Sequence, residues 1–477
     1  MIYRLRRNVE LVERDGESFL MSKTPLCVLR LNRPLADLVG RGLGGELISA
    51  SATEHGVMEQ LVAKGFAERA RSVPQQLWEM PEVSIVIPVM NRAGELRRCL
   101  TSLKQLSYPQ AKLQIIVVDD GSSDDSAIVA QEFGAMLVPS GGVGRGPAAA
   151  RNVGASKATG EILAFIDSDC SASNVWLNEL IPAFNDSAMA AVGGQVDGMC
   201  MESGVDRYEA VMSSLSIGSR ERIGNSGNDT FYLPSCNLLV RQSAFKRAGG
   251  FKDNMHVGED VDLTWRLREN GWTISYLPIG NVLHEHRSSI RSFMSRRFDY
   301  GTSEGMLQIL HPDRRKRMVI PPLLAIILML SLVAPFTGWW SLLPAGGLLA
   351  ADVLTVRLRI GRQNLPITLA AILAGRFRAL GSLIYYLCYH LVRYYSTALI
   401  IFALFVHAGW VLFGVILACA AGVDYAIKKP LLSFPAFAGI YLLEQLAYGS
   451  GVFWGCLRLK CFASYKVDIL RQSELPA

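Results

Sequence analysis

Three short apolar segments, each ending in polar or acidic residues, recur in the middle of the chain. They cover residues 83–88, 113–120 and 162–169 and are rich in β-branched side chains, which is typical of buried strands. Leucines on a single stripe predict a helix over 93–106, and a further helix is expected over 124–134. Strands that alternate with helices in this way predict an α/β domain with a parallel, doubly wound sheet. In such sheets, ligands bind beyond the carboxyl ends of the strands.

The first 70 residues show a different pattern, in which strand-like segments precede amphipathic ones. Two of these segments flank Asp15-Gly16, a pair that favours a hairpin turn. Asn32 is suited to cap the helix that follows it. Ser51 and Glu54 have the spacing of a capping box ahead of a second helix. Strands followed by helices predict a small winged-helix-like module.

Long apolar runs dominate the last third of the chain. Residues 319–340 and 397–423 are each long enough to cross the roughly 30 Å of hydrocarbon in a bilayer. Residues 342–356 and 431–457 are weaker candidates because each contains an acidic side chain. The aromatic-rich segment 385–395 suits the membrane interface. Two to four spans are expected, and a buried helical domain is the alternative.

Composition and charge support this division. Of the 477 residues, 50% are hydrophobic and only 19% are charged, which excludes a disordered or collagen-like chain. Residues 1–318 hold 36 basic and 37 acidic side chains, whereas residues 319–477 hold 12 and 5. Basic residues that flank apolar runs indicate a membrane rather than nucleic acid. We therefore expect a winged-helix-like module over 1–70, a linker over 71–82, an α/β domain over 83–318 and a membrane-associated helical region over 319–477.

The placement of positive charge predicts which side of the membrane each segment faces. Basic residues at 314–317 and arginines at 357, 359 and 362 flank the first two apolar runs and predict cytoplasmic flanks, so these runs would form a hairpin. No apolar segment follows the basic N-terminus, so no secretory leader is expected. Nine scattered cysteines without a C-x-x-C pair are typical of reduced thiols. The expectation is a multi-pass protein of the cell membrane with its catalytic domain in the cytoplasm.

Acidic residues at strand ends carry the candidate chemistry. Asp167 and Asp169 end the third apolar segment, where two carboxylates are costly to bury without a cation. Hard oxygen ligands of this kind suit Mg²⁺ or Mn²⁺ held together with a diphosphate, although an acidic triplet at a surface turn is the alternative. Asp119 and Asp120 end the second segment. There Gly121 and the serines after it can form a turn and a helix cap, which would leave Asp120 for a ligand.

Four further features are candidates for the same site. Glu259 and Asp260 precede an amphipathic helix, where they can stabilise the helix dipole, or Asp260 can serve as a general base for an acceptor hydroxyl. His284 can supply another metal ligand or be structural. The Gly-rich segment 141–146 lacks the Lys-Ser/Thr of a P-loop, so we expect a flexible loop over the ligand. Arg151 follows in a helix that would point at the site.

Taken in order, these segments resemble the family 2 glycosyltransferases of the GT-A fold over about residues 83–300. The motifs that carry the resemblance lie at 83–92, 99–103, 117–122, 150–152, 160–169, 249–251 and 258–260. The resemblance implies a doubly wound transferase domain that takes a nucleotide-diphospho-sugar. Residues 294–298 stand where processive members have Q-x-x-R-W, and they lack both its Gln and its Trp. A long secreted polysaccharide is therefore a less favoured product.

The same resemblance implies a role for each matching residue. It implies that Asp120 accepts a hydrogen bond from the donor nucleobase, and that Asp167 contacts the ribose. It implies that Asp169 and His284 bind Mg²⁺ or Mn²⁺ at the donor diphosphate. Asp260, with Glu259 beside it, would be the catalytic base of an inverting displacement. The donor contacts that it implies are Pro88, Asn91, Asp119, Asp120, Arg151 and Asp167.

The architecture as a whole resembles a narrower group, the glycosyltransferases of the mycofactocin system, and residues 22–32 resemble a PqqD-type peptide-recognition module. This resemblance implies that a hexose, glucose from UDP-glucose, is moved onto a peptide-derived redox cofactor or its precursor, giving an oligoglycoside. The alternative is a membrane glycosyltransferase that acts on a lipid-linked sugar or cell-wall polysaccharide. A third hypothesis, a non-catalytic scaffold with a degenerate transferase domain, is disfavoured because the acidic motifs are intact.

Overall fold

The computed structural model describes residues 2–6, 8–14, 16–23, 26–70, 80–224, 230–361, 365 and 367–470. Asp15 and most of the expected linker, residues 71–79, lie outside this part of the chain. The chain divides into two compact units. The larger unit contains Leu77–Lys316 and Cys388–Val467, and the smaller contains Met1–Gln76, Arg317–Leu387 and Asp468–Ala477. The sequence-based domain boundaries stay predictions.

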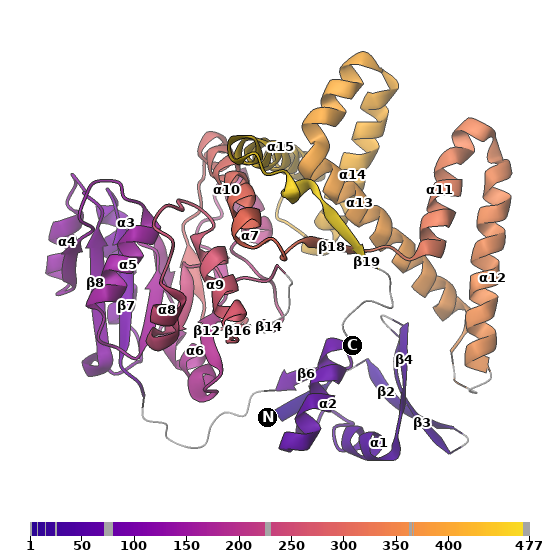
Figure 1. Ribbon diagram of the computed structural model, residues 1–477, viewed down its shortest axis with the longest axis horizontal. Helices are drawn as coiled ribbons and strands as arrows, with labels where there is room; N and C mark the ends of the chain where they lie inside the picture. Colours follow the sequence, from indigo (N-terminus) through magenta and orange to yellow (C-terminus); the bar gives the residue numbers. More distant parts are fainter. Residues whose placement is uncertain are drawn as a thin grey trace. The chain divides into compact units, whose positions relative to one another are not determined.

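The larger unit is built on an eight-stranded sheet of order β14-β16-β12-β15-β10-β7-β8-β9 (Figure 1). The three strands predicted from apolar segments are confirmed as β7, β8 and β10. The strands are β7 (Val83–Val89), β8 (Leu113–Asp119), β9 (Met136–Pro139), β10 (Ile162–Ile166), β12 (Met189–Gly193), β14 (Arg222–Gly224), β15 (Asn237–Arg241) and β16 (Thr273–Tyr276).

The predicted parallel arrangement is present in the strands from which it was inferred, but the sheet as a whole is mixed. Strands β10, β7, β8 and β9 are parallel, but β15 runs antiparallel to both β10 and β12. Asn237, at the start of β15, pairs with Ile166, at the end of β10. This reversal brings Ser235 and Cys236 to the edge of the sheet where the acidic segment after β10 begins.

Helices cover both faces of this sheet, and each face has its own buried cluster of aliphatic and aromatic side chains. One face packs against α3 (Ala93–Lys104), α4 (Ser126–Glu132) and α6 (Trp176–Leu180). The other packs against α5 (Pro147–Lys157), α8 (Gln242–Ala248) and α9 (Glu259–Glu269). The predicted α/β layering is therefore confirmed, with α3 and α4 close to their expected bounds.

A second, smaller sheet positions the end of the acidic segment. It has the order β11-β17-β13 and consists of β11 (Cys170–Ala172), β17 (Val282–His284) and β13 (Val196–Gly198). Strands β11 and β17 are antiparallel, with Cys170 directly opposite His284. Because paired residues point to the same face of a sheet, this register places residues about 115 positions apart side by side.

Five further helices, three of them from the last third of the chain, complete the larger unit. They are α7 (Gly204–Met212), α10 (Ile290–Leu310), the end of α13 (Leu369–Phe405), α14 (Ala408–Lys428) and α15 (Phe434–Leu459). Side chains from all five form one apolar cluster around Tyr208, Phe437 and Tyr441. Helices α10 and α15 lie so close that Gly451 has the carbonyl of Phe298 where a Cβ would stand. The structure does not place α15 among the candidate spans, which corrects the weaker prediction for 431–457.

The N-terminal module belongs to the smaller unit and contains two three-stranded sheets, β5-β1-β6 and β2-β3-β4. The predicted hairpin between β2 and β3, the cap at Asn32 and the capping box of Ser51 and Glu54 are present. Strands β1 and β5 were not predicted. The winged-helix and PqqD-type interpretations stay predictions. The elements are β1 (Ile2–Leu5), β2 (Val9–Arg14), β3 (Glu17–Lys23), β4 (Leu26–Leu31), α1 (Arg33–Gly40), β5 (Leu47–Ser49), α2 (Ala52–Ala63) and β6 (Ala67–Ala70).

Three helices in the part of the chain that the structure describes are long and apolar enough to cross a membrane: Trp339–Gly361, Leu369–Phe405 and Ala408–Lys428. At most 28% of the apolar window of each is buried, which argues against a buried helical domain. The predicted span over 319–340 was wrong, because α11 (Pro322–Thr337) has only 16 residues, about 24 Å at 1.5 Å per residue. Helix α12 (Leu342–Gly361) follows it, and β18 (Lys316–Val319) pairs with β19 (Val467–Leu470).

Candidate active site

A cavity of about 880 Å³ lies at the carboxyl ends of β7, β8 and β10 in the larger unit. Eight of the ten predicted site residues line it, and they come from segments spread over almost 200 positions of the chain. These eight are Pro88, Asp120, Arg151, Asp167, Asp169, Glu259, Asp260 and His284. The fold therefore brings most of the predicted acids and their basic partners to one place.

Asn91 and Asp119 do not line the cavity but hold the loops at its edge. The Asn91 backbone has a φ of 53°, and its side-chain Oδ1 accepts a hydrogen bond from the Ser123 N–H at 2.7 Å. Asp119 Oδ1 accepts from the Ser122 N–H at 2.9 Å. The loops after β7 and β8 are thus tied together. Donor contacts for these two residues stay a prediction.

Asp120 anchors the Gly-rich loop. Its Oδ1 accepts hydrogen bonds from Ser140 Oγ at 2.6 Å and from the Arg145 N–H at 3.0 Å. Its Oδ2 accepts from the Gly146 N–H at 2.8 Å. The loop also lies directly against Gly121, where φ is +87° and a Cβ would be 2.7 Å from Val143 Cγ2. The carboxylate predicted to contact the donor nucleobase is therefore hydrogen-bonded to the Gly-rich loop.

Arg151 joins two of the predicted acids. This guanidinium on α5 is 2% exposed and donates to Asp167 Oδ1 at 2.6 Å and to Glu259 Oε1 at 2.8 Å. Burial favours a higher pKa for Asp167, but the charge and hydrogen bond of Arg151 outweigh it and hold that pKa below its usual range. Asp167 is therefore ionised where a hydroxyl donor, such as a ribose, can meet it.

Glu259 and Asp260 begin α9 after Gly258, whose φ of +80° turns the chain into the helix. Asp260 Oδ2 accepts from the Ser235 N–H at 3.1 Å, and Oδ1 accepts from the Val261 N–H at 2.8 Å. Burial raises the pKa of Glu259 to about 7, and the Asp260 charge adds to this effect. Burial also raises the pKa of Asp260. A carboxylate with a raised pKa is a stronger base, provided that it is ionised.

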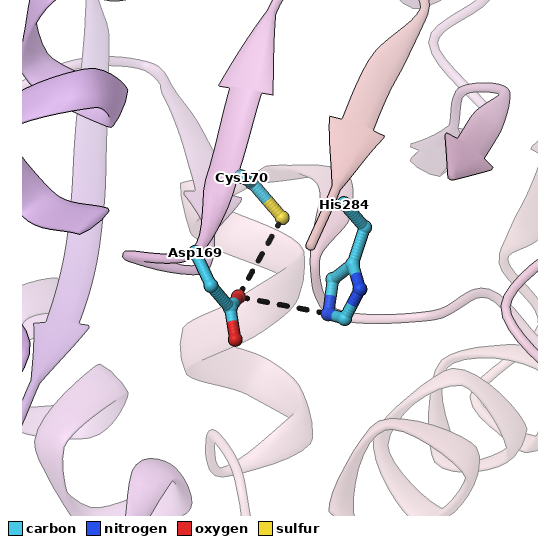
Figure 2. A group of neighbouring side chains, drawn as sticks. All are labelled: Asp169, Cys170 and His284. Carbon is cyan, nitrogen blue, oxygen red and sulfur yellow. Dashed lines mark hydrogen bonds and ion pairs between the residues drawn. The ribbon is translucent and has the colours of Figure 1, made fainter. Parts of the chain in front are cut away.

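Asp169, Cys170 and His284 form a cluster of possible metal ligands (Figure 2). Asp169 Oδ1 lies 3.5 Å from His284 Nε2 and 3.9 Å from Cys170 Sγ. All three ligand atoms lie within 4.8 Å of one another. Asp169 and His284 offer the oxygen and imidazole donors that divalent ions bind, so the residues predicted to hold a metal fit that role. Sequence reasoning missed Cys170.

A buried polar network extends from this cluster toward α15. His286 Nδ1 lies 3.2 Å from His284 Nδ1 and 3.5 Å from Glu209 Oε2. Arg297 Nη2 donates to Glu209 Oε1 at 2.7 Å, and Arg297 Nε lies 3.3 Å from Glu444 Oε1. Burial lowers the pKa of His286 to about 3 and raises that of Glu209 to about 7. The neutral His286 can therefore fix the ring of His284.

Basic side chains that sequence reasoning did not assign also line the cavity. Arg92 forms an ion pair with Asp169 Oδ2, and Arg287 and Arg296 line the same wall. Arg296 lies over the Tyr300 ring, 4.9 Å from its centre. The sequence contained a signal for Arg92, because Arg92 is the last residue of the motif at 83–92. These cations suit the phosphates of a sugar nucleotide.

The far end of the cavity is formed by α10, α13 and α15. Glu304 accepts hydrogen bonds from Lys316 Nζ at 2.6 Å, from Tyr394 Oη at 2.8 Å and from Tyr448 Oη. The Arg393 guanidinium lies 3.5 Å from the centre of the Tyr448 ring. This end combines aromatic faces with hydrogen-bonding groups, whereas the end near Asp169 combines carboxylates with arginines.

Residues 84–249 match the family model described as glycosyl transferase family 2. Two curated sequences of the pre-mycofactocin glycosyltransferase of Mycobacterium tuberculosis are 40% identical over 256 residues, covering 52% of this chain and 52% of each relative. Glycosyltransferase AglE of Haloferax volcanii is 29% identical over 49% of this chain and 76% of its own length. The chain thus spans about half the length of the mycobacterial relatives that it matches.

Among solved structures, the mannosyltransferase PcManGT of Pyrobaculum calidifontis, in complex with GDP-Man and Mn²⁺, is 20% identical with a TM-score of 0.39. That alignment covers 64% of this chain and 91% of the other. The mixed sheet, the helices on both faces and the acids at the strand ends agree with the expected GT-A fold class. Residues 84–249 thus match the model of glycosyl transferase family 2, and over 256 residues the chain is similar to the pre-mycofactocin glycosyltransferase.

Proposed function

We propose that this protein is an inverting, metal-dependent glycosyltransferase that moves a hexose from a nucleotide donor, UDP-glucose, onto a peptide-derived mycofactocin precursor. The observation that supports this proposal most is that Asp260, Asp169 and His284 line one cavity. A candidate base and candidate ligands for a donor-bound cation are thus present together. The choice of acceptor rests on the similarity to the mycobacterial relatives.

Asp169 Oδ1 and His284 Nε2 would hold the divalent cation, which would neutralise negative charge on the leaving diphosphate. Arg92, Arg287 and Arg296 would contact the phosphate oxygens from the same wall. Asp167, kept ionised by Arg151, would accept a hydrogen bond from the ribose. The donor would therefore lie along the carboxyl ends of β10 and β7.

Asp260 would accept the proton of the acceptor hydroxyl as its oxygen attacks the anomeric carbon. The new C–O bond forms while the bond from that carbon to the diphosphate oxygen breaks, and the nucleoside diphosphate leaves with the electron pair. A single displacement of this kind inverts the anomeric configuration. Hydrogen bonds from the backbone N–H groups of Ser235 and Val261 hold the Asp260 carboxylate in place.

The end of the cavity near Tyr394, Arg393 and Tyr448 would receive the acceptor, because the phosphate-binding side chains lie at the other end. Aromatic faces stack on planar or sugar rings, and Glu304 offers carboxylate oxygens for hydroxyl groups. Because α13 and α15 form this end, the C-terminal helices would contribute to acceptor binding in addition to membrane association.

The test is incubation of the full chain, in detergent, with UDP-glucose, Mn²⁺ or Mg²⁺ and candidate acceptors, followed by mass spectrometry. Hexose additions to the mycofactocin precursor that disappear with EDTA support the proposal. Additions only to a lipid-linked sugar would overturn the proposed acceptor but not the transferase activity. If the protein hydrolysed only GDP-mannose, or transferred a sugar only from GDP-mannose, the proposed donor would be overturned.

We also propose that the protein is a multi-pass membrane protein with its transferase domain in the cytoplasm. Three helices meet the length and hydropathy of a span, and Arg357 and Arg359 lie near the C-terminal end of one of them, Trp339–Gly361. Cysteine labelling from either side of sealed vesicles tests the topology. Labelling of a cysteine introduced in the α/β domain from the outer side alone would contradict it.

The second candidate function is transfer to a lipid-linked sugar. One observation favours it, namely that α13 both meets the criteria for a membrane span and lines the cavity with Tyr389, Arg393 and Tyr394. A membrane-embedded acceptor could therefore reach the transfer site along this helix. The acceptor assay above separates the two functions, because the two classes of acceptor are tested side by side.

A further inference from the structure

The ligand cluster of Figure 2 contains a sulfur atom where the sequence predicted only oxygen and nitrogen donors. The pairing of β11 with β17 places Cys170 directly opposite His284, and Asp169 immediately precedes the strand. Figure 2 shows the three side chains directed toward one space. The cluster is therefore a product of strand register rather than of a surface turn.

The two separations that involve Asp169 Oδ1 are close to those of a small tetrahedral site. In such sites the metal lies about 2.0–2.1 Å from nitrogen and oxygen and about 2.3 Å from sulfur, so the ligand atoms are about 3.3–3.6 Å apart. Asp169 Oδ1 is 3.5 Å from His284 Nε2 and 3.9 Å from Cys170 Sγ. Both separations are within a few tenths of an ångström of these values, and the third, from His284 Nε2 to Cys170 Sγ, is at most 4.8 Å.

In Asp169 and His284, the polar side-chain atom that does not face the cluster already contacts a neighbouring side chain. Arg92 occupies Asp169 Oδ2, which leaves Oδ1 directed at the cluster. His286 occupies His284 Nδ1, which leaves Nε2 directed at the cluster. Such outer contacts orient metal ligands and fix the imidazole tautomer. The carboxylate and the imidazole are thus prepared to coordinate through the atoms that face Cys170.

We propose that Cys170 is a third ligand of this site and that the site therefore prefers a thiophilic divalent ion, such as Co²⁺ or Zn²⁺, to Mg²⁺. Sulfur selects softer ions, whereas Mg²⁺ requires oxygen ligands in an octahedral arrangement. Coordination replaces the S–H bond with a metal–sulfur bond, and the proton passes to solvent. The fourth position stays open for a diphosphate oxygen of the donor, and only this last step rests on the proposed function.

A second cysteine near the cluster, Cys236, provides the matched control. Cys236 lies beside Cys170, close enough for a contact between the two thiols, and Cys236, unlike Cys170, lines the cavity. A structural role for Cys170, in which the thiol only packs against Cys236, predicts no sulfur–metal bond. A ligand role predicts one that depends on Cys170 and not on Cys236.

The test is a titration of the metal-free full chain with Co²⁺, monitored by absorption spectroscopy. The wild type and Cys236→Ser should show the near-ultraviolet sulfur-to-cobalt charge-transfer band, and Cys170→Ser should lack it while retaining weaker visible bands. Competition against Zn²⁺ should show at least about tenfold weaker binding by Cys170→Ser, with Mg²⁺ binding unchanged. Equal melting temperatures of the metal-free proteins would show that the fold is intact.

The absence of the band in the wild type, or its persistence in Cys170→Ser, would overturn the proposal. Loss of the band in Cys236→Ser alone would show that Cys236 is the sulfur ligand. This result would also overturn the proposal. These outcomes are independent of glucose transfer. A protein with the band but no transfer would contradict the proposed function. A protein with Mg²⁺-dependent transfer but no band would contradict only the assignment of Cys170 as a metal ligand.

Discussion

The Arg151 guanidinium donates a hydrogen bond to Glu259 Oε1 at 2.8 Å, and both side chains are buried in the wall of the cavity. The same guanidinium also binds Asp167. One cation therefore serves a carboxylate from the end of β10 and another from the start of α9. Because these segments are almost a hundred residues apart, the pair fixes the proposed donor site relative to the proposed base.

Replacing Arg151 with Met should destabilise the protein and abolish transfer. Removing one partner of a buried ion pair costs about 3–5 kcal/mol, because it leaves the other charge buried without compensation. Unfolding monitored by circular dichroism in detergent measures this loss. Arg97→Met is the control, since Arg97 and its partner Glu132 are 50% and 47% exposed and such surface pairs contribute about 0–1 kcal/mol. Equal losses in the two variants would contradict the structural role of Arg151.

Replacing Asp260 with Asn should reduce turnover by about 10²–10⁴-fold, the usual contribution of a general base. The amide keeps the size of the side chain but cannot accept the acceptor proton. Binding of UDP, measured by calorimetry with a divalent ion present, should be unchanged. Asp253→Asn is the control, because Asp253 is outside the cavity and contacts Asn152. Unchanged turnover in Asp260→Asn would refute the assignment of the base.

The raised pKa values of Glu259 and Asp260 predict how transfer depends on pH. A base works only when ionised, so kcat should rise with pH, and because the pKa of Asp260 is raised, the plateau should begin at a higher pH than for an ordinary aspartate. Folding, in contrast, favours the protonated form of Glu259, since its pKa is raised from 4.5 to about 7. Its contribution to stability is therefore complete below pH 4.5 and is lost as the pH rises toward 7.

Glu259→Gln separates the effect of the neighbouring charge from that of the base. Removing the negative charge beside Asp260 should lower the pKa that limits kcat, so the acidic limb of the pH profile should move to lower pH. The measurement is kcat against pH for the wild type and the variant. A limb that stays in place, or moves to higher pH, would show that the two carboxyl groups do not influence each other.

Much of the site could be predicted from local patterns. Asp167, Asp169 and Asp260 stand at the ends of apolar segments or at a helix start, and the carboxyl edge of the sheet collects such positions whatever the exact packing. The same reasoning predicted the alternation of strands and helices over 83–134. It did not predict the reversal of β15, because strand direction depends on pairing between distant segments.

Local sequence patterns did not predict the features that depend on long-range packing. Cys170 becomes a candidate ligand only through its pairing with His284, about 115 residues later. The network of Glu209, Arg297 and Glu444 joins three helices that nothing local connects. The span predicted over 319–340 failed for a local reason, since Gly338, with a φ of +79°, ends the helix early. Apolar composition indicated a membrane segment there but not where the helix stops.

Glycines at the contact between α10 and α15 should be more sensitive to substitution than Gly439 of the same helix. At Gly451 and Gly455, an added Cβ would meet the carbonyl oxygens of Phe298 and Thr302. Because backbone cannot move aside as a side chain can, Gly451→Ala should force the helices apart at a cost of about 1–3 kcal/mol. That shift would displace Tyr448, which lines the cavity, so the KM for the acceptor should rise together with the loss of stability.

Gly439→Ala provides the matched control on the same helix. A Cβ at Gly439 would meet nothing within 4 Å, and Ala is favoured over Gly in a helix by about 0.5–1 kcal/mol. Thermal unfolding in detergent should therefore show Gly439→Ala at or above the wild-type melting temperature and Gly451→Ala below it. If Gly451→Ala were as stable as Gly439→Ala and kept the same KM, then α15 would not be packed tightly against α10, and its role in acceptor binding would lose its structural basis.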